Sequence, residues 1–181
     1  MKRICIYCGS SLGRNPAYIK AARTMANALV KLGIGVTYGG ARIGIMGEVA
    51  DTVLAGGGEV IGVMPRSLVD REIAHSGLTD LHIVDSMHER KSLMADLSDG
   101  FIALPGGIGT LEELFESLTW SQLGIHNKPC GLLNTVQYYD KLCGFLDHAT
   151  SEQFVKPAHR SLLLVEAEPE LLIQRMVDYG T

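Results

Sequence analysis

Hydrophobic positions along the chain gather in short apolar runs, which alternate with longer stretches where apolar residues recur at helical spacing. Several of the short runs are apolar throughout, which is typical of strands buried on both faces of a parallel sheet. The predicted strands are residues 4–8, 36–38, 60–64, 82–84, 101–104, 131–134 and 162–165. This alternation predicts an α/β fold: a Rossmann-like, doubly wound parallel sheet with helices on both faces.

The stretches between the strands carry helix signals. Asn15 and Pro16 suit the N-cap and the first position of the first helix. Further helices are predicted over residues 44–55, 87–97, 110–125, 137–149 and 168–179. The segment 65–80 is the least regular part of the chain. A connection of this length is either functional or surface filler, and the spacing alone does not choose between them.

Length and charge restrict the class of protein. The 181 residues suit one domain, 1–181, with a sizeable core and no linker or repeat. A formal net charge of −4 offers no basic surface for nucleic acid. Uncharged runs fall short of the roughly 20 residues that a membrane helix needs. Because the first residues enter a strand at once, we expect no signal peptide and a cytoplasmic protein.

Cys5 and Cys8 have a spacing that invites a redox or zinc interpretation. Residues three apart on a strand point to opposite faces, however, and no second cysteine or histidine pair completes a metal site. We therefore expect both to be core residues, as we do for Cys130 and Cys143. No metal site is predicted.

Three glycine-rich turns follow predicted strands, at residues 9–13, 39–47 and 105–113. Ligands of open α/β sheets bind beyond the carboxyl ends of the strands, where these turns meet. None of the turns has the glycine order of a dinucleotide site or the lysine of a nucleoside triphosphate loop. Together they predict a mononucleotide-sized anionic ligand held by backbone amides at a helix start.

Two clusters of charged residues have a structural explanation as well as a functional one. Thr110 and Glu113 have the spacing of a capping box, with Thr110 as N-cap, so Glu113 is either a structural cap or a catalytic carboxylate. Glu112 and Glu116 compete with it for the catalytic role. Ser86 and Glu89 form a second potential capping box, and the cations Arg90 and Lys91 follow it. Cations oppose the dipole at a helix start, which indicates either function or two solvated side chains.

The run Pro-Gly-Gly-Ile-Gly-Thr-Leu-Glu-Glu at 105–113, taken with Met-His-Glu-Arg-Lys at 87–91, resembles the Lonely Guy (LOG) family. Members are cytokinin riboside 5′-monophosphate phosphoribohydrolases, often misnamed lysine decarboxylases. The likeness extends to Gly-Ser-Ser at 9–11, to the turn at 39–47 and to Thr-Trp-Ser-Gln-Leu-Gly at 119–124. The signature Pro-Gly-Gly-x-Gly-Thr-x-x-Glu fits without a mismatch.

The resemblance implies hydrolysis of the N-glycosidic bond of AMP or of an N6-modified AMP, with release of the free base and ribose 5-phosphate. It implies Arg90 and Glu113 as the catalytic residues, and neither a metal nor an organic cofactor. The substrate-binding positions that it implies are Glu72, Lys91, Gly107, Ile108, Gly109, Thr110, Leu111, Glu112 and Thr119. It also implies a homodimer, and the surplus of apolar residues over 111–124 favours an interface there.

Two other functions compete with this one. A non-catalytic nucleotide or cofactor carrier with a Rossmann-like core would explain the glycines but leave Arg90 and Glu113 without a task. A pyridoxal-phosphate decarboxylase is disfavoured, because no lysine stands in a recognisable Schiff-base setting and Lys91 adjoins an arginine. The choice between AMP and an N6-prenylated AMP stays open.

Overall fold

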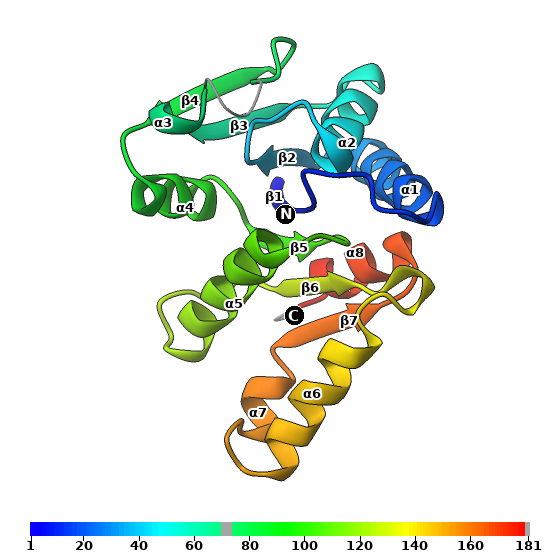
Figure 1. Ribbon diagram of the computed structural model, residues 1–181, viewed down its shortest axis with the longest axis vertical. Coiled ribbons are helices and arrows are strands. Elements are labelled where there is room, and N and C mark those ends of the chain that lie inside the picture. The colour runs from blue at the N-terminus through cyan, green and yellow to red at the C-terminus, as the bar shows by residue number, and fades with distance from the viewer. Residues whose placement is uncertain (70–73, 180–181) are drawn as a thin grey trace.

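The computed structural model describes residues 1–69 and 74–179. Its centre is a seven-stranded sheet in the order β4-β3-β2-β1-β5-β6-β7, and every neighbouring pair is parallel (Figure 1). The strands are β1 (Arg3–Tyr7), β2 (Gly35–Tyr38), β3 (Val60–Pro65), β4 (Asp80–Val84), β5 (Gly100–Ala103), β6 (Cys130–Leu133) and β7 (Leu163–Glu166). The predicted parallel sheet is confirmed, and each strand lies within two residues of its predicted position.

Helices connect the strands. They are α1 (Ala17–Lys31), α2 (Gly44–Ala55), α3 (Arg66–Val69), α4 (Met87–Asp96), α5 (Ile108–Gln122), the 3-10 helix η1 (Thr135–Gln137), α6 (Asp140–Ser151), α7 (Pro157–Arg160) and α8 (Pro169–Val177). α1 begins one residue later than predicted, with Pro16 and not Asn15 as its N-cap, although the Asn15 side chain accepts a hydrogen bond from the Ala17 amide at 3.0 Å. No helix of the described residues is long and apolar enough to cross a membrane.

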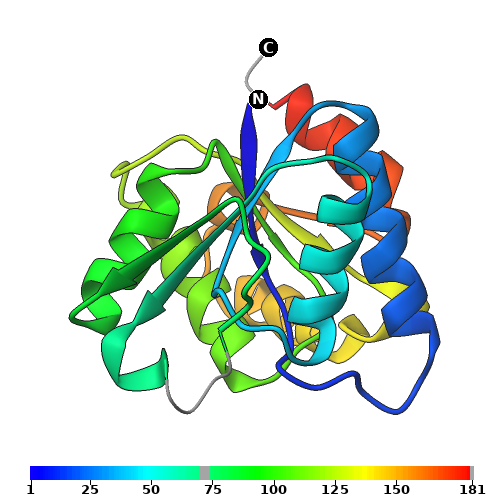
Figure 2. The same ribbon diagram turned by 90° about the horizontal axis from the view of Figure 1, so that it is seen from above.

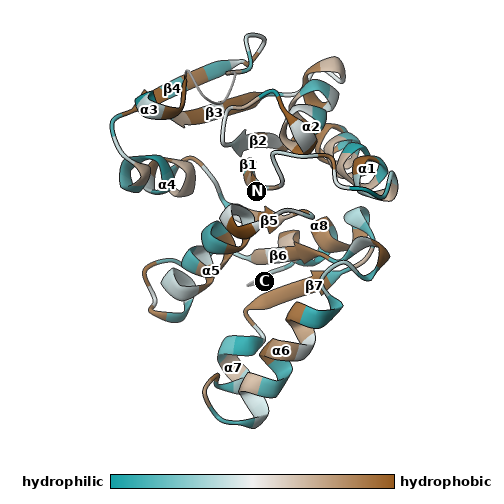
Figure 3. Cartoon of the chain, in the orientation of Figure 1, coloured by the Kyte–Doolittle hydropathy of each residue, from teal (hydrophilic) through white to brown (hydrophobic). Residues whose placement is uncertain are grey.

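The sheet separates two hydrophobic clusters. Figure 2 shows α1, α2 and α8 on one side of the sheet, with α4 and α5 on the other. The first cluster joins the sheet to α1, α2 and α8, and Met25, Leu29 and Val49 are fully buried in it. The second joins the opposite face to α4 and α5 through Met94 and Leu114. Both faces of the sheet are therefore covered, and the strands β3, β5 and β7 are largely brown in the hydropathy view of Figure 3.

The order of the strands creates one switch point. The chain begins at the central strand β1, continues outward to β4, and then returns to β5 on the other side of β1. The loops after β1 and β5 consequently lead away to opposite faces of the sheet and leave a crevice between them. The glycine-rich turns at 9–13 and 105–113 are these two loops.

Local signals explain two element boundaries. At α4 the Ser86 hydroxyl accepts from the Glu89 amide at 3.1 Å, and the Glu89 carboxylate accepts from the Asp85 amide at 2.9 Å. The predicted cap at Ser86 is thus confirmed. The helix predicted over 137–149 begins later, at Asp140, because Val136 and Gln137 take positive φ angles of 44° and 61° that an α-helix excludes.

The four cysteines are free thiols. Cys5 belongs to the second hydrophobic cluster, while Cys8 packs against the first, so the two side chains serve opposite faces of the sheet as predicted. Within residues 1–69 and 74–179 no group of histidine, cysteine and carboxylate side chains is arranged to hold a metal ion.

Candidate active site

A cavity of about 230 Å³ lies at the carboxyl ends of β1, β2 and β5. All three glycine-rich turns contribute to its wall, through Gly9, Gly39 and Gly107. Arg90 from α4 and Glu113 from α5 complete it. The sequence therefore places the glycine turns correctly, and the fold adds one cation and one carboxylate to them.

The start of α5 opens onto this cavity. Gly107 is the N-cap, in an extended conformation (φ −96°, ψ −153°), and no side chain caps the helix. Within residues 1–69 and 74–179 the backbone amides of residues 107–110 donate to no carbonyl or side chain. Unpaired amides at a helix N-terminus form a site for an anion, because the N–H groups and the helix dipole act together.

The predicted capping box at Thr110 is wrong. α5 begins at Ile108, so Thr110 is its third residue and its side chain is buried inside the first turn. Gly107 holds the N-cap position, so the helix begins before the threonine. Glu113 therefore does not occupy the third position of a capping box.

Arg90 is held as a nearly buried cation. Its residue is only 7% exposed, and its Nε donates to the Val63 carbonyl at 3.1 Å. Its Nη2 lies 3.8 Å from Oε1 of Glu113, too far for a hydrogen bond but close enough for strong electrostatic attraction. A buried charge is costly unless it is paired, so each of the two groups offsets the burial of the other.

Gly39 makes room for this guanidinium. A Cβ atom on Gly39 would lie 2.2 Å from Nη2 of Arg90 and 2.6 Å from the Met46 methyl group. Any larger residue would displace the arginine from the cavity wall. The glycine at the end of β2 thus serves a contact with a residue more than fifty positions later, not only a turn.

The charged side chains next to Arg90 and Glu113 in sequence bind one another outside the cavity wall. Lys91 Nζ donates to Glu112 at 2.6 Å and to Glu116 at 2.9 Å, and none of these three residues lines the cavity. Burial alone would lower the pKa of Lys91, but the hydrogen bonds and charges of Glu112 and Glu116 raise it overall. The lysine is therefore a fixed cation between α4 and α5, and of the three glutamates only Glu113 lines this cavity.

Cys8 is a further wall residue of the cavity. Burial, with the negative charge of Glu113 in addition, raises the pKa of the Cys8 thiol well above its usual range. The thiol is consequently neutral at physiological pH, which makes it unsuitable as a nucleophile.

Comparison with known proteins agrees with these features. A family model described as "Possible lysine decarboxylase" matches residues 46–176. A cytokinin riboside 5′-monophosphate phosphoribohydrolase of Rhodococcoides fascians is 50% identical over 165 residues, which cover 91% of this chain and 83% of the relative. The LOG1 enzyme of the same name from Arabidopsis thaliana is 47% identical over 178 residues, 98% of this chain and 84% of the relative. The chain belongs to the Lonely Guy (LOG) family.

Solved structures at lower identity share the fold. The molybdenum cofactor carrier protein of Chlamydomonas reinhardtii has a TM-score of 0.73 at 19% identity and covers 98% of each chain. A molybdenum cofactor binding protein of Rippkaea orientalis has a TM-score of 0.72 at 20% identity, over 100% of this chain and 99% of that chain. At such identities the likeness concerns the architecture alone.

The structure separates the LOG-type positions predicted from the sequence into groups. Gly107, Ile108, Gly109, Thr110, Arg90 and Glu113 line one cavity. Leu111 packs into the second hydrophobic cluster, and Glu112 and Lys91 bind each other outside the cavity wall. Thr119 lies further along α5, where its hydroxyl donates to the Phe115 carbonyl at 2.7 Å. Glu72 lies outside the described residues.

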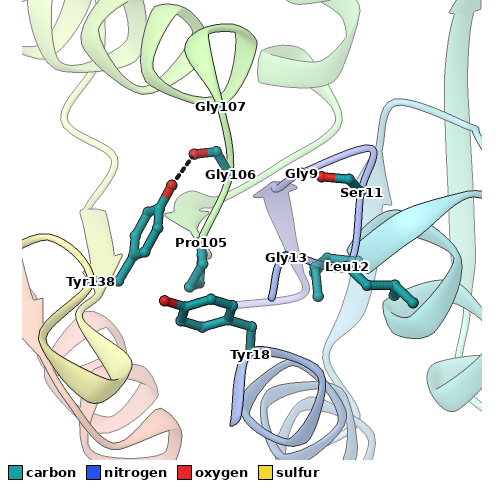
Figure 4. A pocket seen from close by; sticks show the side chains of 10 residues that line it. Gly9, Ser11, Leu12, Gly13, Tyr18, Pro105, Gly106, Gly107 and Tyr138 are labelled. Atoms are coloured by element: carbon teal, nitrogen blue, oxygen red, sulfur yellow. Dashed lines mark hydrogen bonds between the residues drawn. The ribbon is translucent and has the colours of Figure 1, made fainter. Parts of the chain in front are cut away.

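Sequence reasoning missed part of this LOG-type site. Met46 lines the main cavity, and a second cavity of about 170 Å³ adjoins it through Gly9 and Gly107. Figure 4 shows the second cavity, with the rings of Tyr18 and Tyr138 beside Pro105 and Gly106. Met46 stands in a glycine turn that the sequence did single out. No local signal marks Tyr138, which comes from the other half of the chain.

The neutral state of Cys8 is testable by alkylation. In the native protein at pH 8, Cys8 should react with iodoacetamide at least about tenfold more slowly than in the guanidinium-unfolded protein, because a raised pKa lowers the thiolate fraction about tenfold per unit. Peptide mass spectrometry at timed intervals measures the rate at each cysteine. Native labelling of Cys8 at the unfolded rate would contradict the neutral thiol and reopen a nucleophilic role.

Proposed function

We propose that this chain hydrolyses the N-glycosidic bond of adenosine 5′-monophosphate or of an N6-modified form of it. The products are the free base and ribose 5-phosphate. The observation that carries the proposal is the opposition of Arg90 and Glu113, 3.8 Å apart, beside the uncapped start of α5. One anionic end of a substrate and one reacting centre can therefore be held in the same cavity.

The phosphate has a suitable place at the glycine-rich turn of residues 105–113, the glycine loop. A phosphate monoester carries up to two negative charges and accepts several hydrogen bonds, and the amides of residues 107–110 supply donors. Lys91 binds the carboxylates of Glu112 and Glu116, so its positive charge is not available to the phosphate. The phosphate is accordingly held by backbone groups and the dipole of α5.

The chemistry is assigned to Glu113 and Arg90. Cleavage of an N-glycosidic bond builds positive charge on the sugar carbon C1′, as in glycoside hydrolysis. The Glu113 carboxylate stabilises that charge and orients or deprotonates the attacking water. The C1′–N bond breaks as the water oxygen bonds to C1′, and one proton of the water ends on the base. Arg90 assists the departing base by hydrogen bonding, since a guanidinium keeps its proton.

The cavity wall disfavours the two competing functions. A carrier needs the amides but not an arginine and a carboxylate that face each other within the ligand cavity. A pyridoxal enzyme needs a lysine that can become neutral and form a Schiff base. Lys91 is held as a cation by Glu112 and Glu116, which raise its pKa. The family description "Possible lysine decarboxylase" therefore does not describe the chemistry that these residues support.

We also infer a homodimer, in the cytoplasm, with α5 in its interface. Only Thr110, Leu114 and Ser117 of this helix are buried in the single chain. Apolar residues along its outer side are left accessible, among them Leu123 at 66% exposure. Thr119 stands on this side in a groove lined by Phe115 and Leu118. A partner seated there would bring the predicted substrate position Thr119 next to the interface.

The first prediction concerns the ligand. At one hundred times their dissociation constants, AMP and ribose 5-phosphate should raise the melting temperature by about 5–10 °C, because they bind only the native state. Adenosine at the same concentration should do so much less, since it lacks the phosphate. Differential scanning fluorimetry measures the shifts. Equal shifts from AMP and adenosine would contradict a phosphate site at the glycine loop.

The second prediction separates Glu113 from its neighbour. Glu113→Gln keeps the size of the side chain but removes the charge that faces C1′ and the base for water. Hydrolysis of AMP or its N6-isopentenyl form should fall by at least about 10²-fold. Glu112→Gln is the control and should retain most activity, because Glu112 binds Lys91 instead of the cavity. Release of adenine is assayed by chromatography.

Two results would redirect the assignment. Near-normal turnover by Glu113→Gln would remove this residue from the mechanism. An absence of adenine release by the unaltered protein, together with tight AMP binding, would favour the carrier. The relative rates for AMP and N6-isopentenyl AMP identify the preferred substrate in the same assay.

The third prediction concerns the dimer. Light scattering at micromolar concentration should give twice the chain mass of 19.6 kDa. Leu123→Lys should shift the mass toward that of the monomer, because it places a charge in the proposed interface. Leu32→Lys is a matched control, since Leu32 is also an exposed leucine at a helix C-cap but lies on α1, across the sheet. A monomeric mass for the unaltered protein would rule out the interface.

A further inference from the structure

The carbonyl groups of the glycine loop are held one after another from outside the loop. The Tyr139 hydroxyl donates to the Leu104 carbonyl at 2.7 Å, and the Gly9 amide donates to the Pro105 carbonyl at 3.2 Å. The Tyr138 hydroxyl donates to the Gly106 carbonyl at 2.7 Å (Figure 4). Two adjacent tyrosines thus hold two carbonyls of a loop more than thirty residues earlier in the chain.

The Gly106 carbonyl determines where one cavity amide points. The peptide between Gly106 and Gly107 is trans, as are all peptides of the described residues, so its C=O and N–H point in opposite directions. Because Tyr138 holds the carbonyl on the side of the second cavity, the Gly107 N–H is turned away from Tyr138. Gly107 also lines the cavity of Arg90 and Glu113. The hydroxyl of Tyr138 therefore acts on the amide of Gly107 through one rigid peptide unit.

This peptide is the one that most needs an external anchor. It stands between two glycines, which accept both signs of φ, so the two residues themselves set no preferred orientation of its plane. The Leu104–Pro105 peptide differs, since proline has no N–H and rotation there would reorient no donor. Of the two tyrosine contacts, only that of Tyr138 bears on an amide in the substrate cavity.

Tyr138 itself is rigidly held. Its ring packs edge-on against Tyr18 at 5.3 Å and against Tyr139 at 4.7 Å. The preceding residues Val136 and Gln137 take left-handed conformations, which persist only where the surroundings determine them. The Asn134 side chain accepts from the Tyr139 amide at 2.7 Å and fixes the same turn. Tyr138 is 40% exposed, and its place is set by this turn and by the two neighbouring tyrosine rings.

We propose that Tyr138 is a positioning residue for phosphate binding, which holds the Gly106–Gly107 peptide so that the Gly107 amide faces the substrate phosphate. The inference rests on the proposed function, since it assumes a phosphate monoester at the glycine loop. Tyr138 does not touch the substrate; it acts through the loop backbone. Its loss should therefore affect every ligand that carries the phosphate and no ligand that lacks it.

The test compares three hydroxyl deletions by their effect on phosphate-bearing and phosphate-free ligands. Tyr138→Phe should raise KM for AMP and the inhibition constant of ribose 5-phosphate about tenfold, with kcat changed by less than about threefold. Inhibition by adenine, which has no phosphate, should stay the same. Tyr179→Phe, beside Met1 and Asp99 and away from both cavities, removes a hydroxyl that makes no hydrogen bond within the described residues and should leave all of these constants unchanged.

Tyr139→Phe is the second control, because it breaks an equally short bond to the loop at a peptide without an N–H. It should lower the unfolding midpoint while the inhibition constant of ribose 5-phosphate stays the same. Unchanged constants in Tyr138→Phe, or equal weakening of ribose 5-phosphate and adenine, would overturn the positioning role. If the unaltered protein neither hydrolyses AMP nor binds ribose 5-phosphate, the proposed function itself fails, and the inference with it.

Discussion

The site depends on a direct contact between the backbones of two loops at the centre of the sheet. The loops after β1 and β5 meet where the Gly9 amide donates to the Pro105 carbonyl at 3.2 Å. A Cβ atom on Gly106 would lie 2.1 Å from Thr110 Oγ1 and 2.9 Å from the Gly9 nitrogen. No side chain fits between these loops, so the start of α5 lies directly beside the loop after β1, at the wall of the cavity. A larger residue at this point would separate the loops and close or misdirect the anion site.

The meeting of α4 with α5 then sorts five neighbouring charges into two groups. Arg90 and Glu113 face the cavity, while Lys91, Glu112 and Glu116 bind one another beside it. Successive helix positions are turned by about 100°, so residues that adjoin in sequence face different surroundings. The arrangement tolerates a cation near the start of α4 and an uncapped start of α5, both of which are unfavourable for isolated helices. Such local costs are expected where a ligand site overrides helix stability.

Much of the fold follows from local sequence. Short apolar runs place the strands, most clearly β3, β5 and β6, because burial on both faces leaves a pattern that a helix surface does not produce. The edge strand β4 is partly exposed and carries Asp80 and His82. The cap at Ser86 was predictable for the same local reason, since one hydroxyl and one amide three residues apart suffice. Thr110 misled the prediction because its spacing to Glu113 also satisfies a capping box. The actual cap, Gly107, has no side chain and therefore no signal of that kind.

By itself, the sequence determined the parallel α/β fold, the three glycine turns at its carboxyl edge and the family signature that singles out Arg90 and Glu113. Each of these features rests on the spacing of residues within a short segment of the chain. Only the tertiary structure decided that Gly39 makes room for Arg90, that Lys91 binds the two other glutamates, and that Tyr138 holds the Gly106 carbonyl. Each of these contacts joins residues more than twenty positions apart in the chain. The strand order brings these residues together, and the residues next to each of them in sequence carry no signal of the contact.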